Sequence, residues 1–234
     1  MSTGPLAGTT AVVTGASRGI GRAIALRLAE AGAEVALWAR DMIAMRSVAS
    51  DIAAARGKAR AIVVDVSDSG SVSRASELVR ATMPPVRTIV NNAGVVLRKP
   101  LEEVSDEEWR AVMAVNLDGT FYVTRAFLQD LTRSGGRVIN IASISGQQGT
   151  SLLAPYCASK HAVVGLTRAL AEELRAAKIS VNAICPGSVD TQMLQQGLPG
   201  ARPDMTPDDI AKTALFLATS APPALTGSCI DVFG

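Results

Sequence analysis

Histidine is almost absent from this sequence, since His161 is the only one among 234 residues. We therefore expect neither a catalytic triad built on histidine nor a metal site with several histidine ligands. His161 follows Lys160 directly, and on a helix the two side chains would point about 100° apart. We interpret His161 as structural and predict no metal site.

Cysteine is also scarce, with only Cys157, Cys185 and Cys229. Their spacing does not match a metal-ligand pattern, and an odd number leaves one unpaired if two form a disulfide. This usage favours a reduced, cytoplasmic setting in which all three are small buried hydrophobic residues. Residues 1–5 favour the same location, because they lack the basic start and the apolar core of a secretory signal.

The chain also lacks a strong charge bias and long apolar runs. Its net charge is +2, so composition gives no reason to expect nucleic acid or an anionic membrane as a partner. Gly, Pro and charged residues interrupt the apolar runs, and no transmembrane helix is predicted. What remains is a sequence that is 48% hydrophobic and long enough for one substantial core.

Short apolar segments alternate with longer segments of helical periodicity along the chain. Such alternation predicts parallel strands joined by right-handed helical crossovers. We find no internal repeat or linker, and predict a single α/β domain over residues 1–234, a doubly wound parallel sheet with helices on both faces. The predicted strands are 11–13, 34–39, 61–64, 86–90, 136–142, 180–184 and 229–233. The predicted helices are 22–31, 42–56, 67–82, 106–132, 156–177 and 207–219.

A glycine-rich segment, Thr-Gly-Ala-Ser-Arg-Gly-Ile-Gly, follows the first predicted strand at residues 14–21. Glycines at a strand-to-helix turn let the backbone approach a pyrophosphate, and the helix N-terminus offers unpaired N–H groups to that anion. The spacing differs from the commoner Gly-x-Gly-x-x-Gly fingerprint, and a plain tight turn is the alternative. Its position after the first strand of an alternating chain favours a dinucleotide site in a Rossmann fold.

The end of the second predicted strand indicates which dinucleotide binds. A site selective for NAD usually has a carboxylate there, whereas the 2′-phosphate of NADP requires a cation. This chain has Ala39 followed by Arg40, and Arg18 of the glycine-rich segment can reach the same region. Two guanidinium groups favour NADP, with NADPH preferred over NADH. The alternative is that both are solvated surface charges. Asp41 is expected to point elsewhere.

Tyr156 and Lys160 are four residues apart in a segment of helical periodicity, which places them on one helix face. A phenol has a pKa of about 10, and a neighbouring ammonium stabilises the phenolate and lowers that pKa. The pair is therefore a candidate general acid or base. The spacing alone fits a packed ring beside a solvated charge better, but the other segments of the chain reverse this preference.

From residue 9 to the last residue, the sequence resembles the short-chain dehydrogenase/reductase family. Besides the glycine-rich segment and the Tyr156–Lys160 pair, the matching motifs are Asp65-Val66, Asn91-Asn92-Ala93-Gly94, Asn116, Ser143 and Pro186-Gly187 with Thr191. Within the family the chain is most similar to NADP-dependent carbonyl reductases of the 3-oxoacyl-[acyl-carrier-protein] reductase type. The resemblance implies an NADP-dependent oxidoreductase that reduces a ketone, with a 3-oxoacyl group as one candidate, to a secondary alcohol.

The resemblance also implies roles for the matching residues. Tyr156 would donate a proton to the substrate carbonyl as hydride arrives from the nicotinamide, and Lys160 would lower the phenol pKa and bind the nicotinamide ribose. Ser143 would polarise the carbonyl. Asn116, through its side chain or its backbone carbonyl, would position a water that links Lys160 to solvent. Ordinary structural roles, at a strand end and a helix break, are the alternative for Ser143 and Asn116.

The implied cofactor site runs along the cleft from the adenine to the nicotinamide. Asp65 and Val66 would contact the adenine. Asn91, Ala93 and Gly94 would line the adenosine ribose and support the central strand. The full implied set is Gly15, Ser17, Arg18, Gly19, Ile20, Gly21, Arg40, Asp65, Val66, Asn91, Ala93, Gly94, Tyr156, Lys160, Pro186, Gly187, Val189 and Thr191.

The substrate is less well defined. Residues 188–206 follow the nicotinamide motif and contain several Gly and Pro residues, which predicts a loop that forms a lid over the substrate. The residues expected around the substrate are Met193, Leu194, Leu198, Gln147, Gln148 and Leu153. This mixed polarity fits an acyl β-keto group, a small ketone or a polyol. The resemblance to acyl-carrier-protein reductases implies arginines where this chain has Ser134 and Ala177, which disfavours a carrier-protein substrate. Arg133 and Lys178 adjoin these positions, so that substrate stays open.

Two alternative functions remain open at this point. The first is an NAD-linked alcohol or polyol dehydrogenase. The second, more remote, is a dinucleotide-binding regulator without catalytic activity. The resemblance also suggests a homotetramer or a dimer.

Overall fold

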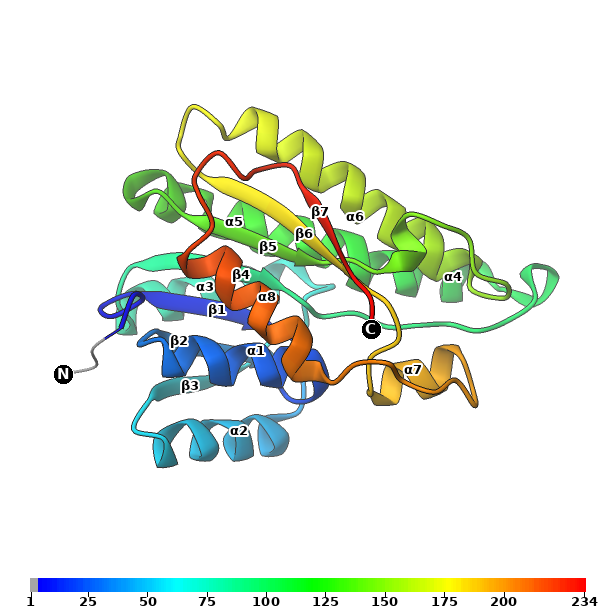
Figure 1. The fold of residues 1–234 in the computed structure, drawn as a ribbon, viewed down its shortest axis with the longest axis horizontal. Coiled ribbons are helices and arrows are strands. Elements are labelled where there is room, and N and C mark those ends of the chain that lie inside the picture. The colour runs from blue at the N-terminus through cyan, green and yellow to red at the C-terminus, as the bar shows by residue number, and fades with distance from the viewer. Residues whose placement is uncertain (1–3) are drawn as a thin grey trace.

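The computed structural model describes residues 4–234 and every side chain there except that of Ser134. Residues 1–3, part of the segment 1–5 considered in the sequence analysis, lie outside the described residues. A sheet of seven parallel strands forms the centre of the molecule (Figure 1), in the order β3-β2-β1-β4-β5-β6-β7. The strands are β1 (Thr10–Thr14), β2 (Glu34–Ala39), β3 (Lys58–Val63), β4 (Val86–Asn91), β5 (Arg137–Ile141), β6 (Ser180–Pro186) and β7 (Cys229–Val232). The predicted doubly wound sheet is confirmed.

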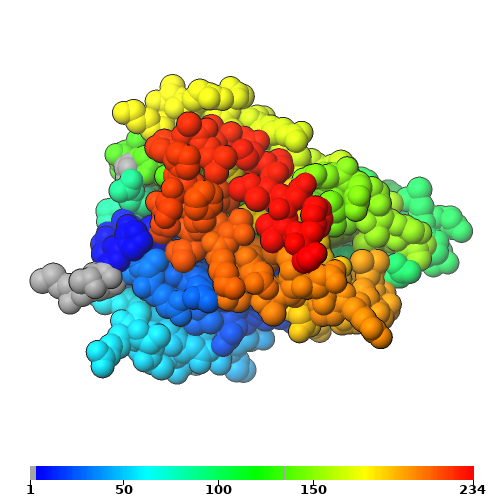
Figure 2. Space-filling model, in the orientation of Figure 1, coloured from blue at the N-terminus to red at the C-terminus, as the bar shows by residue number. Residues whose placement is uncertain are grey.

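Helices cover both faces of the sheet, because each strand sends alternate apolar side chains into two cores. In β1, Ala11 and Val13 belong to one core and Val12 to the other. The first core lies under α1 (Gly19–Glu30), α2 (Met42–Ala54) and α8 (Pro207–Thr219), and the second under α3 (Ser69–Thr82), α5 (Gly119–Ser134) and α6 (Ala154–Glu173). Figure 2 shows α8, in orange, on the near side of the molecule beside the blue atoms of the N-terminal part. Within residues 4–234, no helix has both the length and the apolar character needed to cross a membrane.

The predicted helical segment over residues 106–132 is confirmed, since the backbone is helical from 106 to 134, but its middle is a wider turn that was not predicted. The segment consists of α4 (Asp106–Met113), a π-helical turn (Ala114–Asp118) and α5. The predicted start is correct, because Ser105 and Glu108 form a reciprocal capping box. A wider π turn inserted into a helix is frequent at functional sites.

Asn116 lies inside this π-helical turn and connects it to two other elements. Its Oδ1 accepts a hydrogen bond from the Val95 N–H (2.8 Å), and its Nδ2 donates to the Val95 carbonyl (3.0 Å) and the Ser159 hydroxyl (2.9 Å). These partners are 21 and 43 residues away in the sequence. Tertiary bonds therefore hold the turn, and helix propensity alone does not reveal it.

Smaller differences concern element ends. β3 begins at Lys58, earlier than predicted, and α6 ends at Glu173 instead of residue 177. The segment 188–206, predicted as a loop, contains a short helix, α7 (Gln192–Gly197). Thr191 caps this helix by accepting a hydrogen bond from the Leu194 N–H (3.2 Å), which explains why a Gly- and Pro-containing segment forms a helical turn.

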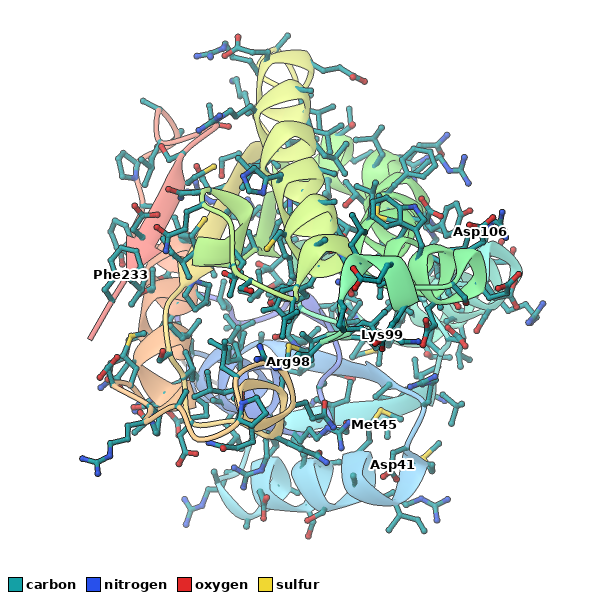
Figure 3. All side chains as sticks on the ribbon, turned by 90° about the vertical axis from the view of Figure 1, so that its right-hand side faces the viewer. Asp41, Met45, Arg98, Lys99, Asp106 and Phe233 are labelled. Atoms are coloured by element: carbon teal, nitrogen blue, oxygen red, sulfur yellow. The ribbon has the colours of Figure 1, made fainter. Side chains whose placement is uncertain are left out.

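The strand order reverses between β1 and β4, which are neighbours in the sheet although two strands separate them in the sequence. In doubly wound sheets, ligands bind beyond the carboxyl ends of the strands at such a switch point. Figure 3 views the molecule from the right-hand side of Figure 1 and shows Arg98 and Lys99, which follow β4, near the middle of this end, with Asp41 at the start of α2. The fold thus brings together the segments that follow β1 and β4.

Candidate active site

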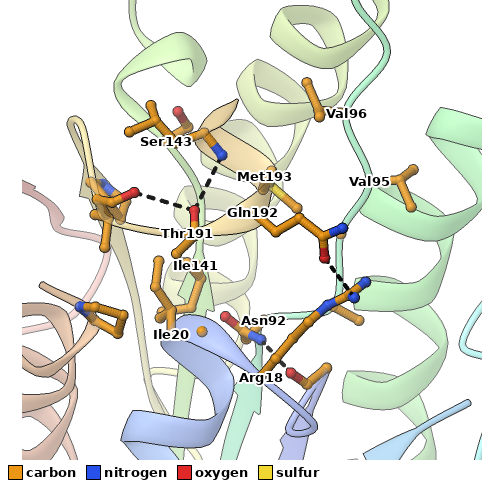
Figure 4. A pocket seen from close by; sticks show the side chains of 18 of the residues that line it. Arg18, Ile20, Asn92, Val95, Val96, Ile141, Ser143, Thr191, Gln192 and Met193 are labelled. Carbon is orange, nitrogen blue, oxygen red and sulfur yellow. Dashed lines mark hydrogen bonds between the residues drawn. The ribbon is translucent and has the colours of Figure 1, made fainter. Parts of the chain in front are cut away.

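A cleft of about 1790 Å³ opens at the carboxyl ends of the strands (Figure 4). It exceeds the volume of roughly 300–1,000 Å³ that is typical of small-ligand pockets, which leaves room for a dinucleotide together with a substrate. Most of the predicted site residues line it, namely Gly15, Ser17, Arg18, Gly19, Ile20, Arg40, Asp65, Val66, Ala93, Gly94, Ser143, Tyr156, Lys160, Pro186, Gly187, Val189 and Thr191.

Three predicted site residues lie behind the wall of this cleft. A Cβ on Gly21 would lie 2.3 Å from the Gly15 carbonyl oxygen, so Gly21 allows close packing of the turn. Asn91 is buried in the sheet and donates to the Asn140 side chain (2.9 Å), which fits its predicted support of the central strand, but it does not line the cleft where the ribose was expected. Asn116 is also buried, and its side-chain amide is fully engaged by protein groups.

The turn between β1 and α1 has the shape required for binding an anion. Gly15 has a φ of +63°, in the left-handed region that favours glycine, and a Cβ there would lie 2.8 Å from Asn92 Nδ2. Among the described residues, no side chain caps the start of α1. Its first N–H groups therefore remain available to a phosphate, which is how such turns hold a pyrophosphate.

Asn92 fixes this turn to the neighbouring strand β4. Its Nδ2 donates to the carbonyl oxygens of Thr14 (2.9 Å) and Gly15 (3.2 Å). The Thr14 hydroxyl in turn accepts from the backbone N–H groups of Asn92 (2.9 Å) and Ala93 (3.0 Å). These four bonds join the ends of β1 and β4 at the switch point and position the glycine-rich turn.

Tyr156 and Lys160 lie together in the first turns of α6. Lys160 Nζ is 5.7 Å from the centroid of the Tyr156 ring, and only 9% of Tyr156 and 4% of Lys160 are exposed. The Lys160 ammonium donates one hydrogen bond to the Ile141 carbonyl at the end of β5 (2.7 Å). An ammonium has three donors, so two remain for other partners.

Burial controls the protonation of both groups. It raises the pKa of Tyr156 to about 12, although a hydrogen bond with Ser143 acts in the opposite direction. Burial also lowers the pKa of Lys160 to about 8. Loss of hydration dominates the pKa of the phenol in this structure, and the lowering of that pKa by Lys160 stays a prediction. At neutral pH Tyr156 is protonated and Lys160 is mostly charged.

The adenosine end of the cleft carries the charged side chains. The Asp65 carboxylate accepts from the Ser67 hydroxyl (2.6 Å) and N–H (3.0 Å), and these bonds, with a smaller contribution from the Arg40 charge, lower its pKa. Asp41 accepts from the Ala44 N–H (3.0 Å) as the cap of α2 and also lines the cleft, so the prediction that it points elsewhere is not confirmed.

The cleft wall near Tyr156 combines apolar side chains with polar ones, such as Ser145, Gln148 and Thr150. Leu153, Tyr156 and Cys157 form a buried cluster against which Val96 and Met193 pack. Among the other residues expected around the substrate, Leu194, Leu198 and Gln148 line the cleft. Gln147 does not, because its amide donates to Asp231 on β7 (2.5 Å). The buried surroundings of the phenol therefore suit an uncharged carbonyl group.

Comparison with known proteins agrees with this geometry. Residues 9–200 match the family model for the short chain dehydrogenases. The chain belongs to the short-chain dehydrogenase family. It is accordingly an oxidoreductase that acts on a CH–OH or C=O group with a nicotinamide dinucleotide as its cofactor.

Several relatives match this short-chain dehydrogenase over almost its whole length. The 3-oxoacyl-[acyl-carrier-protein] reductase FabG of Chlamydia trachomatis is 36% identical, with 99% of this chain and 98% of the relative covered. The (3R)-3-hydroxyacyl-CoA dehydrogenase of Mus musculus is 38% identical, with 96% and 94% covered. A solved structure of a candidate NAD(P)-dependent gluconate 5-dehydrogenase from Beutenbergia cavernae, with NADP bound at low occupancy, is 42% identical with a TM-score of 0.89, covering 97% and 95%.

The sequence analysis does not predict the roles of two residues in the site of this short-chain dehydrogenase. Asn92 belongs to a matching motif, and that motif is the only signal that could have found its role in the glycine-rich turn. Gln192 has no sequence signal. It begins α7, and its Oε1 accepts a hydrogen bond from Arg18 Nη1 (2.8 Å), 174 residues away in the chain (Figure 4).

Replacing Asn92 by Ala is expected to lower the free energy of unfolding by about 1–3 kcal/mol, because two partly buried carbonyl oxygens lose their donor. Urea unfolding monitored by circular dichroism measures this change. The affinity for the dinucleotide should also fall, since the glycine-rich turn loses its connection to β4. A variant with unchanged stability and unchanged dinucleotide affinity would contradict the role of Asn92.

Proposed function

We propose that this short-chain dehydrogenase reduces a ketone to a secondary alcohol with NADPH, and that a 3-oxoacyl group is the first substrate to test. The observation that carries the proposal is the buried Tyr156 phenol, protonated at neutral pH, next to Ser143 in the wall of the cleft. Two relatives described as acting on 3-oxoacyl or 3-hydroxyacyl groups support the substrate class.

In the proposed reaction, the bound nicotinamide supplies a hydride to the carbonyl carbon. The Ser143 hydroxyl donates a hydrogen bond to the carbonyl oxygen and polarises it. The Tyr156 hydroxyl then transfers its proton to that oxygen. Lys160, held in place by the Ile141 carbonyl, stabilises the phenolate that remains, with two N–H donors left for the ribose and for solvent.

The high pKa of Tyr156 bears on the direction of the reaction. A phenol with a pKa of about 12 is a good reservoir for a proton but a poor base near pH 7. Alcohol oxidation needs the phenolate, whereas ketone reduction starts from the phenol. The protonated phenol supports the proposal of ketone reduction.

The preference for NADPH rests on the cations near the end of β2. Arg40 follows Ala39, Asp41 is occupied as the cap of α2, and Arg18 lies in the adjacent glycine-rich turn. A guanidinium group binds phosphate through paired, charge-assisted hydrogen bonds, which a ribose diol without a phosphate cannot match. Residues 188–206 are proposed as the lid, since α7 carries Met193 and Leu194 into the cleft wall.

Assembly and location are part of the same proposal. Trp109 on α4 and Phe121 on α5 expose 38% and 41% of their surfaces, which supports association of these helices with another copy in a dimer or tetramer. The three cysteines are free, and two are buried, which fits a reducing compartment such as the cytoplasm.

A substrate panel tests the reaction. β-Keto esters, diketones and 3-oxoacyl thioesters are incubated with NADPH, and polyols with NADP⁺ or NAD⁺, while the absorbance of the reduced nicotinamide is followed. Oxidation of NADPH by the ketones is the expected result. Turnover confined to polyols with NAD⁺ would establish the alternative dehydrogenase, and binding of the dinucleotide without any turnover would indicate a regulator.

Replacing Arg40 by Ala tests the cofactor preference. The affinity for NADPH is expected to fall about tenfold, because one charge-assisted contact with the 2′-phosphate is lost, while the affinity for NADH changes less than twofold. Isothermal titration calorimetry measures both. Arg46→Ala is the control, because Arg46 is an exposed arginine of α2 that does not line the cleft. An equal loss for NADH and NADPH would contradict a role in recognising the 2′-phosphate.

A further inference from the structure

A hydrogen bond crosses the cleft between the glycine-rich turn and the proposed lid. Arg18 Nη1 donates to Gln192 Oε1 at 2.8 Å, and Figure 4 shows the two side chains extended toward each other. The two segments also lie close together here, since a Cβ on Gly19 would lie 3.3 Å from the Thr191 methyl group. Among the described residues Arg18 has no salt bridge, so the amide of Gln192 is the partner that holds its guanidinium.

The same guanidinium is the proposed ligand of the 2′-phosphate, together with Arg40. Gln192 and the 2′-phosphate would therefore compete for the Arg18 guanidinium. A charge-assisted bond to phosphate is stronger than a bond to a neutral amide, so NADPH can take Arg18 from Gln192, but only by breaking the existing bond. NADH has no 2′-phosphate and leaves the bond intact.

We propose that Gln192 is a specificity-determining residue that competes with the 2′-phosphate for Arg18 and so reduces the preference for NADPH. This inference rests on the proposed function, in which Arg18 binds that phosphate. Cofactor choice usually depends on the residues at the end of β2. Here a residue of the proposed lid would also influence it. The competition also couples the lid to the cofactor, because the bond that NADPH breaks is one that fastens the start of α7.

The expected size of the effect follows from the bond that is lost. A neutral-acceptor hydrogen bond contributes modestly to stability near the surface, and both side chains here are exposed. Removing the competing acceptor should therefore tighten NADPH binding about three- to tenfold and change NADH binding less than twofold. The ratio of the two dissociation constants should shift in favour of NADPH by the same factor.

A double-mutant cycle tests this competition. Gln192→Ala, Arg18→Ala and the double variant are compared with the parent chain, and dissociation constants for NADPH and NADH are measured by calorimetry and by nicotinamide fluorescence. Gln195→Ala is the matched control, because Gln195 is an exposed glutamine of the same helix that bonds to the Ala201 carbonyl instead of Arg18. We expect tighter NADPH binding in Gln192→Ala and no effect of that change once Arg18 is Ala.

Each outcome separates the inference from the proposed function. If Arg18→Ala weakens NADPH binding but Gln192→Ala leaves it unchanged or weaker, the competition is wrong and the cofactor assignment stands. If Gln192→Ala tightens NADPH binding equally with and without Arg18, the effect does not act through Arg18 and the inference is overturned. If Arg18→Ala leaves NADPH binding unchanged, both the assignment of Arg18 and the inference are overturned.

Discussion

Replacing Tyr156 by Phe is expected to lower the rate of ketone reduction at least a hundredfold. The change keeps the ring that packs with Leu153 and Cys157 and removes only the hydroxyl. General acid catalysis by a positioned side chain is worth about 10²- to 10⁴-fold, and the phenol, with a pKa of about 12, is the protonated donor at neutral pH. The rate is measured as NADPH oxidation with the best substrate of the panel.

Two further measurements make this test specific. The variant should bind NADPH within twofold of the parent and unfold at a similar urea concentration, because the packing is preserved. Tyr122→Phe is the matched control, since Tyr122 is the other of the two tyrosines in the sequence. It lies on α5, outside the cleft, with its ring against Arg125. Parental turnover by Tyr156→Phe would remove the proposed proton donor, and an equal loss in Tyr122→Phe would indicate a structural effect.

The fold follows from features that are local in the sequence. β2 and α8 have the predicted bounds, because β2 is a short apolar run and α8 begins at a proline preceded by a capping threonine. The alternation of such segments predicts a doubly wound parallel sheet, since parallel crossovers are right-handed. The strand order and the switch point between β1 and β4 come from the structure, because alternation and handedness are compatible with more than one order.

The site is predictable where a residue type itself carries the chemistry. Tyr156, Lys160 and Ser143 meet in one cleft wall because each follows or begins an element at the carboxyl end of the sheet. Asn91 shows the limit of this reasoning. Its position in a motif is evident from the sequence. Its side chain, however, donates a hydrogen bond to Asn140 on the neighbouring strand, and only the register of β4 and β5 reveals that pairing.

Protonation states lie beyond the sequence for a physical reason. The spacing of Tyr156 and Lys160 indicates that they are close, and closeness favours a lowered phenol pKa. The depth of burial decides the actual direction, because loss of hydration penalises both charged forms. Burial depends on the whole molecule, including the loop that carries Leu153 and the lid that carries Met193.

Replacing Lys160 by Met is expected to lower the rate of ketone reduction at least a hundredfold. The thioether keeps the apolar stem but lacks the ammonium that stabilises the phenolate. In the parent, kcat/KM for reduction should be constant below pH 8 and fall above it, because the pKa of Lys160 is about 8 in the folded protein. The variant should lack this alkaline decline.

Stability provides a second readout with a definite sign. An unfolded lysine keeps its proton up to about pH 10.4, whereas the folded protein releases it near pH 8. Between these values the unfolded chain binds more protons, so the parent becomes more stable as the pH rises, by on the order of 3 kcal/mol over the full interval. Lys160→Met has no such proton to release, and its free energy of unfolding should therefore gain nothing from this group over the same interval.

Urea unfolding of parent and variant at pH 7 and pH 9.5 measures that difference. At pH 7 the variant avoids burying a charge but leaves the Ile141 carbonyl without its donor, so the two effects oppose each other. Lys58→Met, an exposed lysine on the edge strand β3, is the control and should change neither the rate nor the pH dependence of stability. A stability difference between parent and Lys160→Met that does not vary with pH would mean that Lys160 keeps an ordinary pKa, and the alkaline decline in rate would then need another group.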